Sequence, residues 1–342
     1  MQQTIRDLVD ISTYAGCRAD YTQGGGGNTS VKNDKEGVML IKASGYRLKD
    51  ITENNAFVAV NRKKIYDYYK SVDLTVKKDY EKESADIAKS SVIAVSGMPV
   101  LRPSVEVGFH AILKKYVIHT HSVYANILTC CKEGEKIAEE LFGGKDYGYI
   151  FLPYINPGFE LTLAMKNKIN DYIAEKGKYP EIIFMKNHGL VVCSDYLDRV
   201  KALNTDVNET IRIRFGLADD FHEVILNKTE DGFVSDTNSV TDFVRDNTLD
   251  KAFLDKYPLY PDQLVYLNNI LAHSPQTLSI NGDKVVYHTD IKQATTLEET
   301  LAAYLFVIKT IKDNGLTVQT MSEKEVDFIN NWEAEKYRRS VK

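Results

Sequence analysis

The sequence predicts a layered α/β protein with a smaller C-terminal α+β extension, on three observations. Helical and strand-like patterns alternate over residues 1–215, which is typical of helices covering a central β-sheet. The pattern changes after this point, so that residues 216–342 form a second region with its own hairpin and helix signals. The total of 342 residues is enough for one large core and a smaller appended domain.

The first region opens with a helix and a glycine-rich segment. Ile5, Leu8 and Val9 recur at the spacing of one helix face. The segment QGGGGNTS (residues 23–30) follows, and then the strand-like VMLIKAS (residues 38–44). The expected order is therefore helix, glycine-rich loop and strand.

A further helix and strand are expected near the middle of this region. RPSVEVGFHAILKK is typical of a helix that begins at Pro103 or Ser104. YVIHTH after it resembles a short buried strand, and NILTCC continues as a helix. PEIIFMKNHGLVVCSD predicts two strands joined by a tight turn at Asn187, His188 and Gly189.

The second region combines turn-rich and regular segments. Residues 221–243 are polar and indicate a linker or irregular excursion. The pair Asn281-Gly282 between β-prone residues predicts a hairpin.

Two amphipathic helices close the chain. The first has a capping box of Thr295 and Glu298 and a stop at Gly315, and the second has a capping box of Ser322 and Glu325. This region is typical of packing or oligomerisation rather than of catalysis.

Composition argues against several classes of function and location. The net charge of −5 gives no overall basic field for nucleic acid or an anionic membrane. No apolar run approaches the roughly 20 residues that span a bilayer, and the first residues lack the apolar stretch of a signal peptide. The four cysteines show no CxxC spacing, which argues against disulfides and a thiolate zinc site. We therefore expect a cytoplasmic protein.

Three histidines form the strongest chemical pattern. His119 and His121 are two residues apart in a predicted strand, so their side chains point to one face. His188 lies in a turn at a strand end, where a third imidazole can converge on them. A catalytic zinc ion commonly has three protein ligands and one open position. An isolated HxH pair more often packs within a sheet, and the other four histidines lie in less suggestive contexts.

Glu106 is a carboxylate placed just before the strand that carries His119 and His121, near the start of a predicted helix. At a helix start it is favoured by the helix dipole, which explains it without any catalysis. Beside a metal ion it becomes a candidate ligand and general base for a proton α to a polarised carbonyl. His110 follows one helical turn later on the same face and is a candidate support for Glu106.

The glycine-rich segment is a candidate anion site. Consecutive glycines allow backbone amides to converge on an anion, although such runs are more often simple turns. The pattern fits neither a Walker A loop nor the dinucleotide fingerprint. Further donors are offered by Ser44 and Gly45 after a strand, and by Ser104 at a helix start.

Together these segments resemble a known family. GGGGNTS, KASG, PSVE-x3-H, HTH, LPY and NHG occur in the order found in the class II aldolase/adducin family. The resemblance covers residues 1–215 and is most similar to the aldolase part of the long bacterial rhamnulose-1-phosphate aldolases, without their dehydrogenase domain. It implies a three-layer α/β/α sandwich around a central β-sheet, and a homotetramer with sites at subunit interfaces.

The resemblance also implies roles for single residues. His119, His121 and His188 correspond to the ligands of one Zn²⁺ ion per subunit, and Glu106 to the base. Tyr154 of LPYINPG corresponds to a proton donor. The residues that correspond to the substrate-phosphate site are Asn28, Ser44, Gly45 and Ser104.

Two departures from the family pattern stand out. Val105 occupies the place of a second phosphate-binding serine, and an insertion (residues 130–146) precedes LPY.

The activity implied is reversible cleavage of a ketose 1-phosphate, similar to rhamnulose 1-phosphate, into dihydroxyacetone phosphate and an aldehyde such as lactaldehyde. Catalysis would proceed through a metal-stabilised enediolate. The alternatives are a sugar-phosphate 4-epimerase, dehydratase or decarboxylase on the same scaffold, and a non-catalytic adducin-like interaction module. No nucleic-acid or membrane partner is expected.

Overall fold

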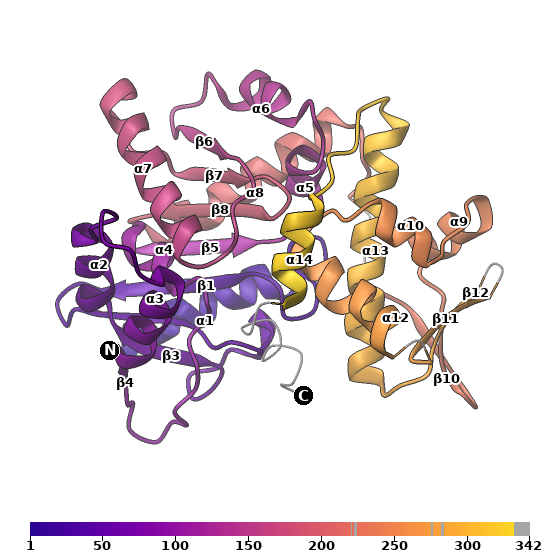
Figure 1. Ribbon diagram of the computed structural model, residues 1–342, viewed down its shortest axis with the longest axis horizontal. Helices are drawn as coiled ribbons and strands as arrows, with labels where there is room; N and C mark the ends of the chain where they lie inside the picture. Colours follow the sequence, from indigo (N-terminus) through magenta and orange to yellow (C-terminus); the bar gives the residue numbers. More distant parts are fainter. Residues whose placement is uncertain (220, 222–223, 275, 282–283, 332–342) are drawn as a thin grey trace.

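The computed structural model describes residues 1–219, 221, 224–274, 276–281 and 284–331 (Figure 1). Its main sheet has eight strands in the order β4-β3-β2-β1-β5-β8-β7-β6. Neighbouring strands are antiparallel except β6 and β7, which are parallel. The strands are β1 (Asn28–Asn33), β2 (Val38–Lys42), β3 (Phe57–Asn61), β4 (Val92–Ile93), β5 (Tyr116–Thr120), β6 (Tyr149–Leu152), β7 (Ile182–Met185) and β8 (Gly189–Ser194).

Helices cover both faces of this sheet (Figure 1). One face carries α1 (Gln2–Gly16), α5 (Val123–Thr129) and α8 (Leu197–Arg214), with α6 (Gly134–Phe142) packed on α5. The other carries α2 (Arg62–Ser71), α3 (Tyr80–Ser90), α4 (Val107–Ile112) and α7 (Phe159–Lys176). Alternate residues of β5 supply the two cores, since Ile118 packs on the first face and Val117 on the second. The predicted three-layer α/β/α sandwich is confirmed.

The C-terminal extension contains a second sheet of four strands in the order β11-β12-β10-β9. Its strands are β9 (Leu226–Thr229), β10 (Gly232–Ser235), β11 (Leu278–Asn281) and β12 (Lys284–Tyr287). Its helical segments are α9 (Asn238–Asp246), α10 (Lys251–Lys256), α11 (Pro261–Gln263), the π-helical η2 (Leu264–Asn268), α12 (Asn269–His273), α13 (Ile291–Asp313) and α14 (Glu323–Asn331). The first region also contains a short 3-10 helix, η1 (Leu48–Asp50).

The predicted linker over residues 221–243 is wrong. β9 and β10 pair as a hairpin within it, and α9 follows. Their polar side chains reflect an exposed hairpin rather than missing structure, because three of the four residues of β9 are exposed. The hairpin predicted at Asn281-Gly282 is supported by the pairing of β11 with β12, although Gly282 lies outside the described residues.

Two predicted helix starts need correction. α13 begins at Ile291, because Asp290 accepts a hydrogen bond from the Gln293 amide and caps the helix there. Thr295 lies inside the helix and donates its hydroxyl to the Ile291 carbonyl. α4 begins at Val107 rather than at Pro103 or Ser104, because the Ser104 amide is still bonded to the Lys42 carbonyl at the end of β2.

Two other predicted features are confirmed. Gly315, with φ +67°, follows the end of α13. The capping box of α14 forms as expected, since the Ser322 amide donates to Glu325 and the Glu325 amide donates to Ser322.

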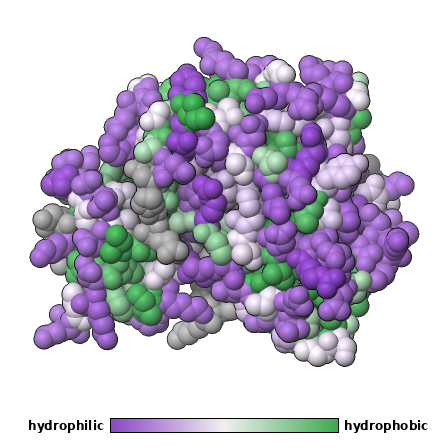
Figure 2. All heavy atoms as spheres, turned by 180° about the vertical axis from the view of Figure 1, so that it is seen from behind, coloured by the Kyte–Doolittle hydropathy of each residue, from purple (hydrophilic) through white to green (hydrophobic). Residues whose placement is uncertain are grey.

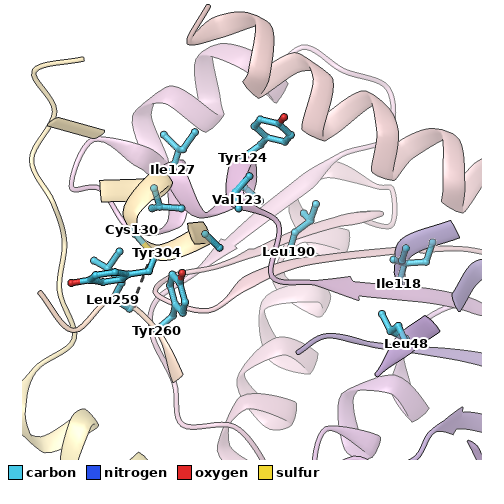
Figure 3. Close-up of a cluster of buried hydrophobic side chains, with 14 of the residues drawn as sticks. Leu48, Ile118, Val123, Tyr124, Ile127, Cys130, Leu190, Leu259, Tyr260 and Tyr304 are labelled. Carbon is cyan, nitrogen blue, oxygen red and sulfur yellow. Dashed lines mark hydrogen bonds between the residues drawn. The ribbon is translucent and has the colours of Figure 1, made fainter. Parts of the chain in front are cut away.

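The two regions share one hydrophobic core. Leu259, Tyr260 and Tyr304 of the extension lie beside Cys130 of the first region (Figure 3), and Leu190 belongs to the same core. The outer surface seen from behind is mostly hydrophilic, with separate hydrophobic patches (Figure 2). Among the helices of the described residues, none has the length and apolar character needed to cross a membrane. The domain boundary near residue 215 stays a prediction.

Candidate metal centre and active site

The candidate site lies where the ends of adjacent strands of the main sheet meet. Asn28, the first residue of β1, is paired with His119 near the end of β5. Thr120 of β5 is paired with Leu190 near the start of β8. Because these strands are antiparallel, the start of β1, the end of β5 and the start of β8 lie at the same edge. The sheet therefore brings segments far apart in sequence to one point.

His119, His121 and His188 converge at this edge. One ligand atom from each lies within 4.8 Å of the others, and all three side chains are buried. His188 precedes Gly189, where a Cβ would lie 2.4 Å from the Thr120 carbonyl oxygen. Only glycine permits this close approach of the turn to β5. The predicted grouping of the three histidines is thus reproduced in space.

Hydrogen bonds fix how two of these imidazoles face the site. His119 Nδ1 lies 3.0 Å from the Leu190 carbonyl oxygen, and His121 Nδ1 lies 2.5 Å from Asp262 Oδ2. A carbonyl or carboxylate oxygen only accepts, so each Nδ1 carries a proton, and in the neutral imidazole Nε2 then presents a lone pair. The two Nε2 atoms face each other at 3.1 Å.

Glu106 completes the group, as predicted from its position. Its Oε1 lies 3.2 Å from His188 Nε2 and its Oε2 lies 3.5 Å from His119 Nε2. Burial raises the pKa of the Glu106 carboxyl, but the neighbouring histidines outweigh this and hold its pKa well below the usual value. Burial lowers the pKa of His119 to about 3. The site at neutral pH therefore has an ionised carboxylate beside a neutral His119 imidazole.

A chain of hydrogen bonds orients Glu106 from behind. Asn28 Nδ2 donates to Glu106 Oε2, and also to Ser104 Oγ at 3.2 Å. The other end of the amide, Asn28 Oδ1, accepts from His110 Nε2, and Ser30 Oγ lies 2.7 Å from His110 Nδ1. His110 thus supports Glu106 through Asn28 rather than by direct contact.

A pocket opens from this group towards the surface. It is lined by Asn28, Ser44, Gly45, Ser104, Val105, Glu106, His121 and His188, together with Gly25, Gly27, Lys42, Pro157 and Pro261. All four residues predicted for the phosphate site are among them. The Ser44 and Ser104 amides are bonded to carbonyls of the protein, so the hydroxyls are the donors that these serines offer to a ligand.

The chain matches one family model, that of the class II aldolase and adducin N-terminal domain, over residues 6–215. It belongs to the class II aldolase/adducin family. The family match covers every residue of the histidine group, Glu106 and the four predicted phosphate contacts.

Individual relatives cover parts of the chain. The uncharacterized oxidoreductase YuxG of Bacillus subtilis (strain 168) is 29% identical over 195 residues, which are 55% of this chain and 26% of that protein. The chain thus spans only part of the length of this curated relative.

Solved structures include the N-terminal class II aldolase domain of a conserved protein from Thermoplasma acidophilum. It is 27% identical, with a TM-score of 0.50, and covers 61% of this chain and 92% of that chain. An L-fuculose 1-phosphate aldolase is 19% identical, with a TM-score of 0.41, over 67% of this chain and 92% of that chain.

Tyr154 is placed differently from the other predicted site residues of this aldolase-family chain. It follows β6 and packs against a cluster that includes Leu264, Val265 and Met321 of the extension. It is not among the described residues that line the pocket. Its role as proton donor stays a prediction.

Two features of the aldolase-family site were not predicted from sequence. Asp262 binds a histidine from 141 residues away, and Lys42 lines the pocket while donating to the Gly25 and Tyr46 carbonyls. The glycine-rich loop is partly occupied by the protein itself, since the Gly24 amide donates to Glu299 Oε2 at 2.8 Å. The C-terminal segment NWEAEKYR (residues 331–338) also resembles the long bacterial rhamnulose-1-phosphate aldolases in sequence, but residues 332–338 lie outside the described residues.

Proposed function

We propose that this protein is a metal-dependent aldolase that cleaves a ketose 1-phosphate into dihydroxyacetone phosphate and an aldehyde. The proposal is carried by one observation: three buried histidines and a buried carboxylate converge beside a pocket lined by Asn28, Ser44 and Ser104. A centre for carbonyl chemistry and a set of anion donors therefore share one cavity.

The donor set fits a divalent cation. The Nε2 atoms of His119 and His121 lie 3.1 Å apart, and when both imidazoles are neutral their lone pairs face each other, which is unfavourable without a cation between or beside them. Glu106 Oε1 is buried and lies 3.2 Å from His188 Nε2, on the same side as the imidazoles. His119, His121 and His188 would hold the ion, most simply Zn²⁺, in the three-ligand arrangement of catalytic zinc sites. Such an ion supplies a Lewis acid for the substrate carbonyl oxygen.

Glu106 is the proposed base. Its carboxylate lies at the pocket wall beside the histidines, within reach of a proton on the carbon next to a carbonyl held there. Asn28 holds Oε2 in place through its amide, which leaves Oε1 to take and return that proton. Cleavage also needs a proton at the aldehyde oxygen, and we assign its donor to Tyr154.

The four pocket residues Asn28, Ser44, Gly45 and Ser104 are proposed to bind the substrate phosphate. Serine hydroxyls are suited to donate to phosphate oxygens. The similarity of motifs favours rhamnulose 1-phosphate as substrate and lactaldehyde as product. The same similarity favours a cytoplasmic homotetramer with Zn²⁺, and residues 1–215 as the catalytic domain.

Metal analysis combined with a panel of ketose 1- and 5-phosphates tests the proposal. Stoichiometric zinc and aldehyde release from a ketose 1-phosphate are expected. Epimerised sugar, loss of water or loss of CO₂ would instead establish one of the alternative reactions on the same scaffold. Absence of bound metal and of turnover across the panel would overturn the enzymatic proposal in favour of an interaction module.

A further inference from the structure

A carboxylate of the C-terminal extension reaches the histidine group. Asp262 lies at the start of α11, and its Oδ2 is 2.5 Å from His121 Nδ1. Both side chains are buried, with 3% and 7% of their surfaces exposed. A carboxylate is favourable at a helix start for electrostatic reasons alone. Here, however, its Oδ2 is directed at the imidazole of His121.

The same extension holds the turn that carries His188. Asn187, with φ +51°, donates its side-chain amide to the Leu259 and Gln319 carbonyls, each at 2.8 Å. Leu259 packs in the shared core beside Cys130 (Figure 3). Residues 258–263 are therefore fixed in place by packing as well as by polar contacts.

The glycine-rich loop leaves room for Asp262. A Cβ on Gly26 would lie 2.4 Å from Asp262 Oδ2 and 2.8 Å from His121 Nδ1. Any side chain at this position would push the two groups apart. The third glycine of the run thus has a steric reason that concerns the histidine group directly.

We propose that Asp262 is a positioning residue of the metal centre, and that residues 258–263 complete a site whose ligands all come from residues 1–215. By accepting a hydrogen bond from His121 Nδ1–H, the Asp262 carboxylate fixes the tautomer and ring orientation that turn Nε2 towards the ion. A carboxylate behind a metal-binding histidine also increases its basicity as a ligand. The inference rests on the proposed metal site and adds to it a group outside the matched family domain.

The test measures metal affinity directly. Zn²⁺ affinity is determined by competition with a chromophoric chelator, and the visible absorption of Co²⁺-loaded protein reports the geometry of the site. D262A is expected to weaken Zn²⁺ binding about 10- to 100-fold, the usual effect of losing such a partner, and to change the Co²⁺ spectrum. D262N keeps an acceptor oxygen and is expected to lose less. G26A keeps the Asp262 carboxylate but pushes it away from His121, so it is expected to weaken Zn²⁺ binding as D262A does.

Two control variants separate positioning from general destabilisation. D290A removes an exposed carboxylate that caps α13 in the same extension. G144A adds a methyl group where nothing lies within 4 Å. Both are expected to bind Zn²⁺ as the unmodified protein does.

The outcomes distinguish the two proposals. If the unmodified protein binds no divalent ion at the histidines, the proposed function and this inference both fail. If it binds Zn²⁺ and folded D262A and G26A bind equally well with an unchanged Co²⁺ spectrum, only the inference is overturned. Should D262A fail to fold, D262N and G26A decide the question by the same measurements.

Discussion

The two regions of the chain contribute to the candidate site in different ways. The first supplies the ends of β1, β5 and β8, and with them the three candidate histidine ligands. The extension supplies contacts behind those groups. Asp262 binds His121, and Glu299 of α13 binds both the Gly24 amide and Arg47.

This difference shows how an appended region can become part of a site without adding a ligand. Site residues on the strand ends are held in place by the sheet. The loops and turns that connect these strands need support from outside the sheet. The Asn187 turn and the glycine-rich loop are the two places where the extension gives that support. Variants of paired residues in the two regions test this division of roles.

The largest effect is expected from the histidines. His188→Ala should remove or greatly weaken bound metal and lower kcat/KM by at least about 10³-fold, since a catalytic ion supplies several kcal/mol of transition-state stabilisation. His119→Ala and His121→Ala should do the same. Metal content by elemental analysis and a cleavage assay provide the measurements.

His288 of the extension is the matched control. It is exposed and bonded to Ser279 and to the Asp231 carbonyl, so His288→Ala should leave both quantities unchanged. Full metal occupancy in His188→Ala would exclude that histidine as an essential ligand.

Glu106→Gln should come next in size. Without a carboxylate base, deuterium exchange into dihydroxyacetone phosphate should fall by about 10²- to 10⁴-fold, the range of general base catalysis, while the fold is retained. NMR of the exchanged substrate provides the measurement. Glu298 is a buried glutamate of the extension bonded to Ser235 and Tyr287, and Glu298→Gln should exchange normally. Exchange at the original rate in Glu106→Gln would refute its role.

Tyr154 of the first region packs against the extension, and its proposed role as proton donor can be tested by separating the two half-reactions. Tyr154→Phe should keep most of the deuterium exchange but slow cleavage by about 10²-fold, because the phenol is needed only at the aldehyde oxygen. Tyr124→Phe is the control, since its ring is buried in the core that contains α13. An equal fall in both reactions would show that Tyr154 shapes the site instead.

A smaller effect is expected at the phosphate site. Ser44→Ala should raise KM for the phosphorylated ketose about 10-fold, because a hydrogen bond to a charged group contributes about 1.5–3 kcal/mol. Steady-state kinetics with the unphosphorylated sugar provide the internal comparison, and the KM for this sugar should change little in Ser44→Ala. Equal kcat/KM for the sugar and its phosphate in the unmodified protein would contradict the assignment.

The smallest effect concerns stability alone. Asp290→Ala should reduce the free energy of unfolding by about 1 kcal/mol through loss of the α13 cap, measured by denaturant titration. The catalysed exchange of deuterium into dihydroxyacetone phosphate, measured without denaturant, should be unchanged. A matching loss of activity would show that α13 acts on the site more directly than its contacts with Gly24 and Arg47 indicate.

Local patterns were enough to predict the histidine group. The spacing of His119 and His121 and the turn at His188 are properties of short segments, and antiparallel pairing then brings the segments together. The start of α4 was not predictable in this way, because a tertiary bond from Ser104 to Lys42 overrides the local proline and serine signals.

Long-range contacts account for what the sequence left out. Nothing in the residues around Asp262 marks it as a partner of His121, since the pairing depends on how the extension packs on the first region. The glycine-rich loop shows the same limit. Its amides were expected to face a ligand anion, yet one of them binds the protein's own Glu299.

The two hydrogen bonds behind His119 and His121 differ in how they respond to mutation. His119 is oriented by the Leu190 carbonyl, a main-chain group that every residue type at position 190 would supply. His121 is oriented by a side chain, which a single nucleotide change can abolish. Any shortened form of the chain that ends before residue 258 must therefore find a new acceptor for His121, while His119 keeps its own.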